Sequence, residues 1–554
     1  MPTPLTLQSA TVLHVTGSEA PGRGHENADR CVASHPSHPS IESDAHMAAV
    51  NNGAVDAPRA TALRKSLGVI DGIAIAASST AATTSIGVGL GVIAAVVGLQ
   101  MPVVLVLAFV PILGIASGYA RLNRVEPNCG NSYVWVGRSL SPWLGFLTGW
   151  MAIVAVVVFM AYTTAIAGSA ILQLAGMAGL HSIGGLTLDP DSTLQSTMLG
   201  LTILGAVTFT AVRGVAVAAR LQKYLLVFEY VVLIGFCTYG LFAGDQPFSL
   251  SWFDPFAIPS FAVLAQGMVI AVFFYWGFEA AFSVSEEVRD PRDASRAGVI
   301  TVFLVLGLFL LGAVAFQRVL TPTELADNGT VGLAFLGEAL ARQPLAALPV
   351  VALMFSVVAS LQAIVIPSAR GLFAMGRDRT LGPVWTRIHS RYGTPAAGTV
   401  LLGAISAVVA LLATVIPKLS DLLGAGISSI GLVVAVWYGL TALAAAVRFR
   451  GLLREHPWEG LRAVVFPALS ALVLLALGGY LGWIFYTSAD HLEFSATNGW
   501  FQLLFPVLIL ISGLVVAAHA KWVRRSPYFV TGRGTDAGDA DLLGAPTEVP
   551  VTTP

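Results

Sequence analysis

Two long apolar stretches of this chain are interrupted near their middles by residues that could bind a small polar molecule. The first interruption is the run SSTAATTS at residues 78–85, and the second is Trp276-Gly277-Phe278-Glu279. Inside a membrane, an unpaired backbone group costs several kcal/mol, so a helix breaks there only where the freed amides and carbonyls line a cavity or hold a ligand. The two interruptions therefore predict one binding site built from two broken helices.

The composition identifies an integral membrane protein. Of 554 residues, 55% are hydrophobic and 11% are charged, and the mean hydropathy of +0.77 excludes a soluble protein of this length. The net charge of −1 gives no indication of a nucleic-acid partner. Cys31, Cys129 and Cys237 lack the spacing of a disulfide framework or a metal site. The sequence also has no nucleotide-binding loop and no nucleophile elbow, so we expect neither an enzyme nor a cofactor.

Twelve apolar segments follow residue 65, each near or above the roughly 20 residues that cross a bilayer. The first, third and eighth are longer than a straight crossing, which favours tilted or broken helices. Lys and Arg gather in every second connection, and the opposite connections carry only Arg318, Arg342 and Lys418. Because basic loops stay in the cytoplasm, we expect both termini there. The expected spans are 67–98, 101–122, 142–174, 194–212, 221–243, 263–288, 296–318, 346–374, 396–416, 423–447, 463–486 and 500–523.

The spans divide into two halves of opposite direction. Spans 1–5 start in the cytoplasm and end outside, whereas spans 6–10 do the reverse, so the interrupted spans 1 and 6 take equivalent positions. That arrangement is typical of transporters built from inverted repeats. Nothing upstream of Met47 resembles a folded segment, so translation is expected to start there. The predicted parts are a disordered cytoplasmic tail (1–65), repeat 1 (66–243), repeat 2 (262–448), two further spans (463–523) and a disordered cytoplasmic tail (524–554).

Several motifs resemble those of the amino acid-polyamine-organocation superfamily of permeases. The resemblance implies a leucine-transporter-like fold, with ten helices in two inverted five-helix repeats and two peripheral helices. It also implies alternating access, with the substrate between broken helices 1 and 6. The motifs span residues 66–450 in the family's order: Asn123 to Trp135 after helix 2, FYWGFE (274–279) and EEVRDP (286–291) at helix 6, and RGLFAMGRD (370–378), LGP (381–383) and YGTP (392–395) after helix 8.

The resemblance also indicates which groups bind an amino acid. In this family the backbone at the helix 1 break meets the carboxylate, and carbonyls of helix 6 meet the amine, as helix-end charges favour. The chain departs from the family's common Gly-x-Gly-Ile-Phe at helix 1, where its hydroxyls either replace backbone contacts or bond back to an unbroken helix. The expected substrate-binding residues are Ser79, Thr80, Ala81, Thr83, Thr84, Ser85, Phe274, Tyr275, Trp276 and Gly277.

Two carboxylates are candidates for proton coupling. Glu229 lies within apolar span 5, where a charged carboxylate costs roughly 2.5–3.5 kcal/mol on insertion scales. Removal from water favours the neutral acid, so Glu229 could bind and release a proton, in place of the lysine that some proton-coupled relatives have there. The alternative is an ion pair with Arg220 or Lys223 near the inner surface. Glu279 is either a second protonatable group or a cap for the amides freed at the break.

Residues next to the second break suggest gates. Trp276 is expected either to cover the substrate as an aromatic gate or to pack as an ordinary tryptophan. Glu286 and Glu287 are expected in a solvated cytoplasmic cluster, with an inner gate formed with Arg370 or Arg377 as the alternative.

The driving ion and the substrate remain broader expectations. The proton gradient is the expected source of energy, and sodium held by Ser356 and Ser360 is the alternative. No arginine sits at mid-membrane to demand a dicarboxylic substrate, so small neutral amino acids are favoured in a plasma-membrane symporter. A polyamine or organocation permease, an exchanger, a channel and a transporter-like nutrient sensor stay open. The lipid bilayer is the other expected partner, and the sequence does not indicate an oligomeric state.

Overall fold

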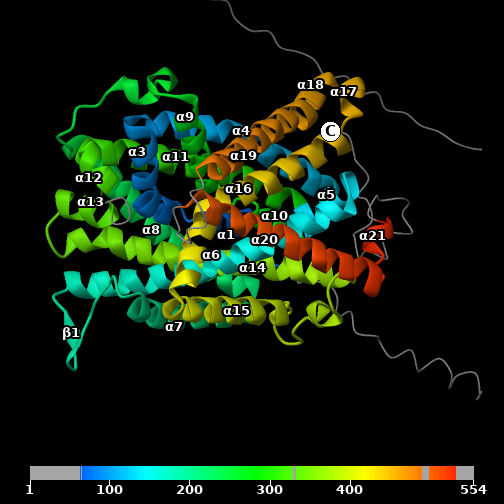
Figure 1. Ribbon diagram of the computed structural model, residues 1–554, viewed down its shortest axis with the longest axis horizontal. Helices are drawn as coiled ribbons and strands as arrows, with labels where there is room; N and C mark the ends of the chain where they lie inside the picture. The colour runs from blue at the N-terminus through cyan, green and yellow to red at the C-terminus, as the bar shows by residue number, and fades with distance from the viewer. Residues whose placement is uncertain (1–62, 64, 328–331, 489–497, 532–554) are drawn as a thin grey trace, which may run out of the picture. The chain divides into compact units, whose positions relative to one another are not determined.

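The computed structural model describes residues 63, 65–327, 332–488 and 498–531 (Figure 1). Met47 and nearly all of the predicted N-terminal tail lie outside these residues. The elements of the first half are α1 (Val69–Thr80), α2 (Ala82–Thr84), the π-helical turn η1 (Ser85–Gly89), α3 (Leu90–Val97), η2 (Gly98–Gln100), α4 (Met101–Val125), α5 (Ser132–Ser139), α6 (Pro142–Met177), α7 (Thr193–Arg213) and α8 (Val215–Ala243).

The second half also consists of long helices joined by short turns. Its elements are η3 (Leu250–Phe253), η4 (Pro255–Ala257), α9 (Phe261–Phe274), α10 (Ala280–Ser283), α11 (Pro291–Val319), α12 (Pro322–Asp327), α13 (Gly332–Leu340), η5 (Leu345–Ala347), α14 (Leu348–Arg377), η6 (Pro383–Thr386), α15 (Ala396–Val415) and α16 (Pro417–Arg448). The described chain ends with α17 (Leu452–Glu455), α18 (Pro457–Gly460), the π-helical turn η7 (Leu461–Val465), α19 (Phe466–Thr487), α20 (Gly499–Ala518), the π-helical turn η8 (His519–Val523) and α21 (Tyr528–Thr531).

The described helices agree with the twelve expected spans. Ten stretches are long and apolar enough to cross a membrane, and one of them, Val69–Val125, has 57 residues. A straight helix of that length would measure about 85 Å, against roughly 30 Å of hydrocarbon, and it is divided at Gly98, whose φ is +61°. Dividing it, and adding α9 and α10 as one interrupted span, gives twelve. Of the three long segments, the first is broken, whereas α6 and α14 are continuous helices.

Local sequence signals set where several helices begin. Ser192, Ser260, Asp290 and Asn498 stand directly before α7, α9, α11 and α20, and each side chain accepts a hydrogen bond from a backbone N–H of the first turn. Such caps satisfy amides that have no partner within the helix. The helix starts therefore follow from residues that the sequence displays.

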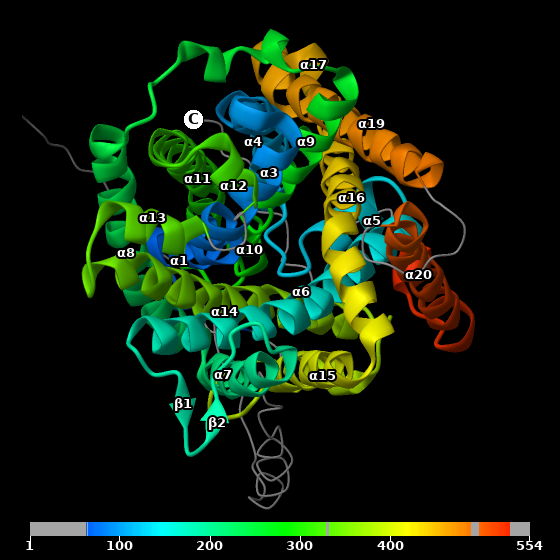
Figure 2. The ribbon, with the colours of Figure 1, turned by 60° about the vertical axis from the view of Figure 1, so that its left-hand side comes forward.

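Helices far apart in the sequence pack in pairs. Contacts join α4 with α11, α6 with α14, α7 with α15, and α1 with α10. Figure 2 shows α6 beside α14 and α7 beside α15. Helix α14 is the most enclosed span, with 78% of its apolar window buried, against 33% for α7, α8, α15 and α20. Most side chains of α14 therefore contact other helices, whereas α7, α8, α15 and α20 leave much of their surface on the outside of the bundle.

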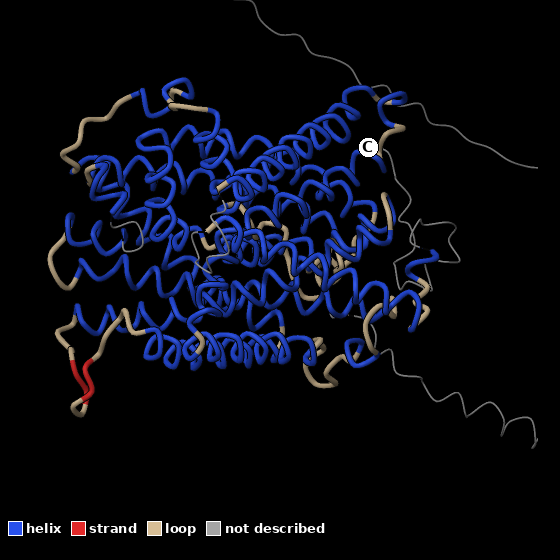
Figure 3. The backbone as a smooth tube through the Cα atoms, viewed as in Figure 1, coloured by secondary structure: helices blue, strands red, loops and turns tan. Residues whose placement is uncertain are grey.

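Almost all of the regular structure in the described residues is helical (Figure 3). The exception is a hairpin of β1 (Ser182–Ile183) and β2 (Leu186–Thr187), which pair antiparallel between α6 and α7. Residues 524–531, which the sequence places in a disordered tail, are ordered and end in α21. The reason is burial, because the Tyr528 side chain packs into the bundle with 2% of its surface exposed.

Candidate functional site

The first span is interrupted at Ala81, within the predicted run. Ala81 is left-handed, with φ 48° and ψ 50°, and its N–H donates to Ser78 O at 3.2 Å. A residue with a side chain costs roughly 1–2 kcal/mol in this conformation, so the surrounding packing must enforce it. The Thr80 hydroxyl bonds back to Ala76 O at 2.7 Å, as the simpler alternative foresaw for such residues. Among the described residues, the buried hydroxyls of Ser78, Thr83 and Thr84 have no hydrogen-bond partner.

The second interrupted span meets the first. Helix α9 ends at Phe274, a turn covers 275–279, and Gly277 has a φ of +118°, which side chains rarely tolerate. A Cβ on Gly277 would lie 2.5 Å from the carbonyl carbon of Ser79 and 2.7 Å from the nitrogen of Thr80. The backbones of the two breaks are therefore in direct contact, which brings the two predicted substrate-binding segments together.

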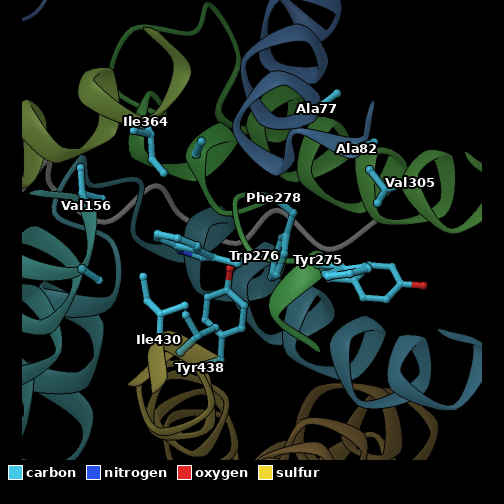
Figure 4. Packing of buried hydrophobic residues seen from close by; sticks show 14 of the residues in the cluster. Ala77, Ala82, Val156, Tyr275, Trp276, Phe278, Val305, Ile364, Ile430 and Tyr438 are labelled. Carbon is cyan, nitrogen blue, oxygen red and sulfur yellow. The ribbon is translucent and has the colours of Figure 1, made fainter. Parts of the chain in front are cut away.

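The residues around Gly277 point to different sides. In Figure 4 the Tyr275 ring and the Trp276 indole extend in opposite directions. The Tyr275 hydroxyl donates to Leu105 O of α4 at 3.1 Å, so Tyr275 secures the break to a neighbouring helix. Trp276 packs edge-on against Phe159 of α6, with 5.4 Å between the ring centroids, and its Nε1 has no partner in the described part of the chain.

Glu279 bonds an amide of the second break itself, but its side chain does not cap α10, the inner half of the span, as one of its two predicted roles required. Its Oε2 accepts the Gly277 N–H at 3.0 Å and also accepts the hydroxyl of Tyr438 from α16. The Gly277 N–H lies 3.3 Å from the Tyr438 oxygen as well. Sequence reasoning missed Tyr438. The available signal was a tyrosine in the middle of an apolar span, because a buried phenol needs a hydrogen-bond partner.

A small cavity of about 50 Å³ lies beside this network. Trp276 and Glu279 border it together with Asn131, Thr148, Ser368 and Trp437. It is far smaller than the roughly 300–1,000 Å³ of typical ligand pockets. Of the residues predicted to bind substrate, Trp276 borders this cavity, whereas those of α1, α2 and η1 do not.

Glu229 is buried in α8 without a hydrogen-bond partner. Its exposure is 0%, and neither carboxylate oxygen is bonded within the described residues. The Ser356 side chain of α14 lies beside it, outside hydrogen-bonding geometry. The alternative ion pair is wrong, because Lys223 pairs with Asp71 of α1 at 2.8 Å and Arg220 is exposed.

The second proposed sodium ligand behaves differently from Ser356. The Ser360 hydroxyl donates to Val357 O at 2.9 Å, within its own helix, whereas the Ser356 hydroxyl has no partner among the described residues. The sodium alternative stays a prediction.

Two ion pairs stand next to the second break, and the burial of Glu287 with Arg370 corrects the expectation of a solvated cluster. Glu287 forms a two-pronged pair with Arg370, with Nε–Oε2 at 2.7 Å and Nη2–Oε1 at 2.8 Å. The two side chains are only 1% and 2% exposed. Glu286 forms a similar two-pronged pair with Arg377, at 2.7 and 3.0 Å, and these side chains are 14% and 13% exposed. The expected solvation failed because the chain folds 284–290 back against α14, which the linear sequence does not reveal.

Two further segments join these pairs. The Cys129 N–H, from the loop before α5, donates to Glu286 Oε1 at 2.9 Å. At the start of the first span, Leu67 bridges to Val288 as in a parallel sheet, and its N–H donates to Glu287 O at 3.0 Å. Loop 2–3, the entry to span 1, the segment after span 6 and the end of α14 therefore converge at one place, the arginine-rich end of α14.

Fold and site together define a class of protein: a membrane transporter, with two interrupted helices in contact inside an apolar bundle and paired charges at one end. The chain belongs to the amino acid permease family, whose model matches residues 67–531, and its family and relatives are transporters, not enzymes. This confirms the superfamily that the sequence motifs resemble.

Relatives within the family have low identity to this chain. It is 25% identical over 333 residues to the low-affinity putrescine importer PlaP of Escherichia coli K12, covering 57% of this chain and 68% of that protein. It is 22% identical over 430 residues to the branched-chain amino acid permease BcaP of Bacillus subtilis, with coverage of 76% and 89%. An uncharacterized transporter of Mycobacterium tuberculosis H37Rv is 29% identical over 501 residues, with coverage of 88% and 97%.

Proposed function

We propose that this chain is a secondary active transporter that moves amino acids across the plasma membrane by alternating access. The observation that carries the proposal is the contact between the two helix breaks, where Gly277 lies against the backbone of Ser79 and Thr80. Helix ends that meet inside a membrane bring uncompensated amides and carbonyls to one place. Amides there suit a carboxylate, and carbonyls suit an ammonium group, so an amino acid matches both.

In this proposal residues 79–85 hold the substrate carboxylate and residues 274–277 hold its amine. The unpartnered hydroxyls of Thr83 and Thr84 support the first assignment, because buried polar groups are almost always paired. The substrate would supply the missing partners when it binds.

Glu229 is the proposed proton site of a symporter. An ionised carboxylate without any partner is costly at this depth, and binding a proton removes that charge. Helices α1, α2 and α14 all pack against α8, which carries Glu229. A change in the charge of Glu229 would therefore occur close to the first break, which lies between α1 and α2. Glu279 is better explained as a fixed acceptor that holds the turn of the second break against α16, because it already accepts two hydrogen bonds.

Two ion pairs, one buried and one partly exposed, are the proposed inner gate. They join the segment after span 6 to α14, so the cytoplasmic entrance opens only when Glu287–Arg370 and Glu286–Arg377 separate. Charge placement supports the orientation, since the arginine-rich end of α14 belongs on the cytoplasmic side, as do both termini. The packing of spans on their counterparts supports the inverted repeats 66–243 and 262–448.

Uptake into proteoliposomes tests the function. The purified protein would be given labelled amino acids and polyamines, with an imposed proton gradient and with or without sodium. Concentrative uptake of an amino acid under the proton gradient alone is the expected result. Accumulation that requires sodium would replace the proton with sodium. Binding without any uptake, or exchange that needs internal substrate, would contradict the symporter and favour a sensor or an exchanger.

A second candidate is an organocation permease, which one specific observation favours. Glu279 is the only charged side chain that borders the described cavity, and the indoles of Trp276 and Trp437 border it too. A carboxylate with aromatic faces suits an amine, through charge and cation–π attraction. The relative described as a putrescine importer fits this candidate. Preferential accumulation of putrescine in the same uptake panel would establish it over the amino acid.

A further inference from the structure

The last described residues of the chain are fastened to the arginine-rich end of α14. After η8, Arg525 is left-handed with φ 51°, which turns the chain back, and the Ser526 N–H donates to Ala520 O at 3.0 Å. The Ser526 hydroxyl donates to Asp378 O at 2.6 Å. Asp378 directly follows Arg377, so this bond anchors the C-terminal segment beside a residue of the proposed gate.

Tyr528 occupies a slot between α5 and α6 that fits its ring closely. Its hydroxyl donates to Tyr133 O at 2.8 Å, and the rings of Tyr133 and Tyr528 stack, with centroids 4.6 Å apart and planes 9° from parallel. Glycines form the wall of the slot. A Cβ on Gly137 would lie 2.2 Å from the Tyr528 hydroxyl oxygen, and one on Gly145 would lie 2.3 Å from it.

The slot also touches the cavity. Tyr133 borders the cavity that Trp276 and Glu279 border. Its hydroxyl lies 3.4 Å from that of Thr380, and Thr380 in turn donates to Met375 O of α14 at 2.8 Å. The C-terminal segment therefore ties α5 and the start of α6 to the end of α14.

We propose that residues 526–531 are a lock that holds the cytoplasmic gate closed, and that Tyr528 must leave its slot before the gate opens. The inference rests on the gate of the proposed function. Opening at this end requires α5 and α6 to separate from α14, and such a movement breaks either the Ser526–Asp378 bond or the Tyr528–Tyr133 contacts. A stacked aromatic pair and a buried hydrogen bond both oppose that separation.

The alkylation rate of Cys129 measures gate opening without any substrate. Cys129 is 1% exposed, borders the cavity, and its Sγ lies 3.4 Å from Arg377 Nη2. In a Cys31→Ser, Cys237→Ser background, maleimide labelling of purified protein reports how often this thiol becomes accessible. Tyr528→Ala is expected to raise the rate about tenfold, as the loss of one aromatic stack and one hydrogen bond implies. Tyr528→Phe keeps the ring, so its rate should lie between that of Tyr528→Ala and the parent.

Matched variants separate the lock from general loosening. Tyr224→Ala removes a tyrosine that is 71% exposed, and its labelling should equal that of the parent. Gly137→Ala should accelerate labelling, because its Cβ would lie 2.2 Å from the Tyr528 hydroxyl oxygen and 2.9 Å from the ring carbon that bears it. A background that keeps only Cys237, which is 0% exposed in α8, should stay unlabelled throughout.

An unchanged Cys129 rate in folded Tyr528→Ala would overturn the lock, and so would equal acceleration at Cys237. Neither outcome depends on uptake, so this inference can fail while the transport proposal stands. Conversely, a failure of uptake leaves the labelling result interpretable.

Discussion

Glu229 and Glu287 are both buried carboxylates, but they differ in whether an arginine compensates the charge. Glu229 and Glu287 are 0% and 1% exposed, yet only Glu287 has a guanidinium against it. Glu287 forms a structural contact, because Arg370 compensates its charge. The unpaired group has no such compensation, so its charge state can couple to events nearby. The sequence predicted both residues as candidates, but pairing is a property of the fold.

The first prediction concerns Glu229→Gln. A glutamine has nearly the same shape but cannot carry the proton, so accumulation driven by a pH gradient should fall to the equilibrium level. Exchange at equal pH on both sides should persist, because the substrate site is intact. Both are measured in proteoliposomes, with exposed Glu338→Gln as the control. An unchanged rate with an unchanged pH dependence would remove Glu229 from the mechanism.

The second prediction concerns Glu287→Gln. This change leaves Arg370 buried and charged without its partner, which destabilises a protein by about 3–5 kcal/mol. The melting temperature in detergent should therefore fall by several degrees. Glu459→Gln is the matched control, because Glu459 pairs with Arg121 at 2.9 Å but is 58% exposed, and exposed pairs contribute little. Equal melting temperatures for the two variants would mean that the Glu287–Arg370 pair does not hold this end together.

The third prediction concerns Asp378, at the boundary of α14 and the lock. Burial raises the pKa of Asp378 to about 7, and the nearby charge of Glu126 adds to the rise. A hydrogen bond with Tyr133 and the charges of Arg377 and Arg138 lower the pKa, but by less. A raised pKa means that the folded protein binds the proton more tightly than the unfolded chain. The resulting stability is fully present below about pH 4 and is lost as the pH rises through about 7. Asp378→Asn should flatten the fall in melting temperature between these values, and an unaltered profile would contradict the assignment.

At the scale of elements, the sequence foresaw most span boundaries to within a few residues. The expected span 142–174 corresponds to α6, and 396–416 corresponds to α15. Length, apolarity and charge placement decide such boundaries, and each is a local property. The first break was foreseen as a run of residues, but its position at Ala81 depends on the backbone of Gly277, about 200 residues away in the sequence. Tyr438, Cys129 and the slot of Tyr528 escaped prediction for the same reason.

The contact between the breaks gives the fourth prediction. In Gly277→Ala, the new Cβ would meet the backbone of Ser79 at 2.5 Å, and φ would stay at an angle that costs about 1–3 kcal/mol. Backbone atoms cannot move aside as a flexible side chain can, so uptake should be lost. Gly307→Ala in α11 is the control, because nothing lies within 4 Å of its Cβ position. Uptake by Gly277→Ala equal to that of Gly307→Ala would show that the close contact is not needed for transport.

At the scale of the whole molecule, helix contacts recur when each span is exchanged for its counterpart in the other half. The contact of α8 with α14 becomes that of α16 with α6, and α1 with α11 becomes α9 with α4. Contacts between a span and its own counterpart, as for α7 and α15, are expected along a two-fold axis. The pattern supports an inverted repeat, in which the same packing serves both sides of the membrane. A transporter that opens alternately to the two sides can therefore use the same helix–helix contacts on each side.

The last prediction follows from that topology. If basic connections stay in the cytoplasm, the β1–β2 hairpin lies outside the cell and the loop after α14 lies inside. In a variant without native cysteines, Gly184→Cys in the hairpin should react with a membrane-impermeant maleimide on intact cells, whereas Arg391→Cys should not. Both should react after lysis, which shows that each thiol is accessible. The reverse pattern would place the arginine-rich end of α14 outside and make the proposed inner gate an outer one. Labelling at both sites in intact cells would mean that the two loops share one side, which an inverted repeat does not permit.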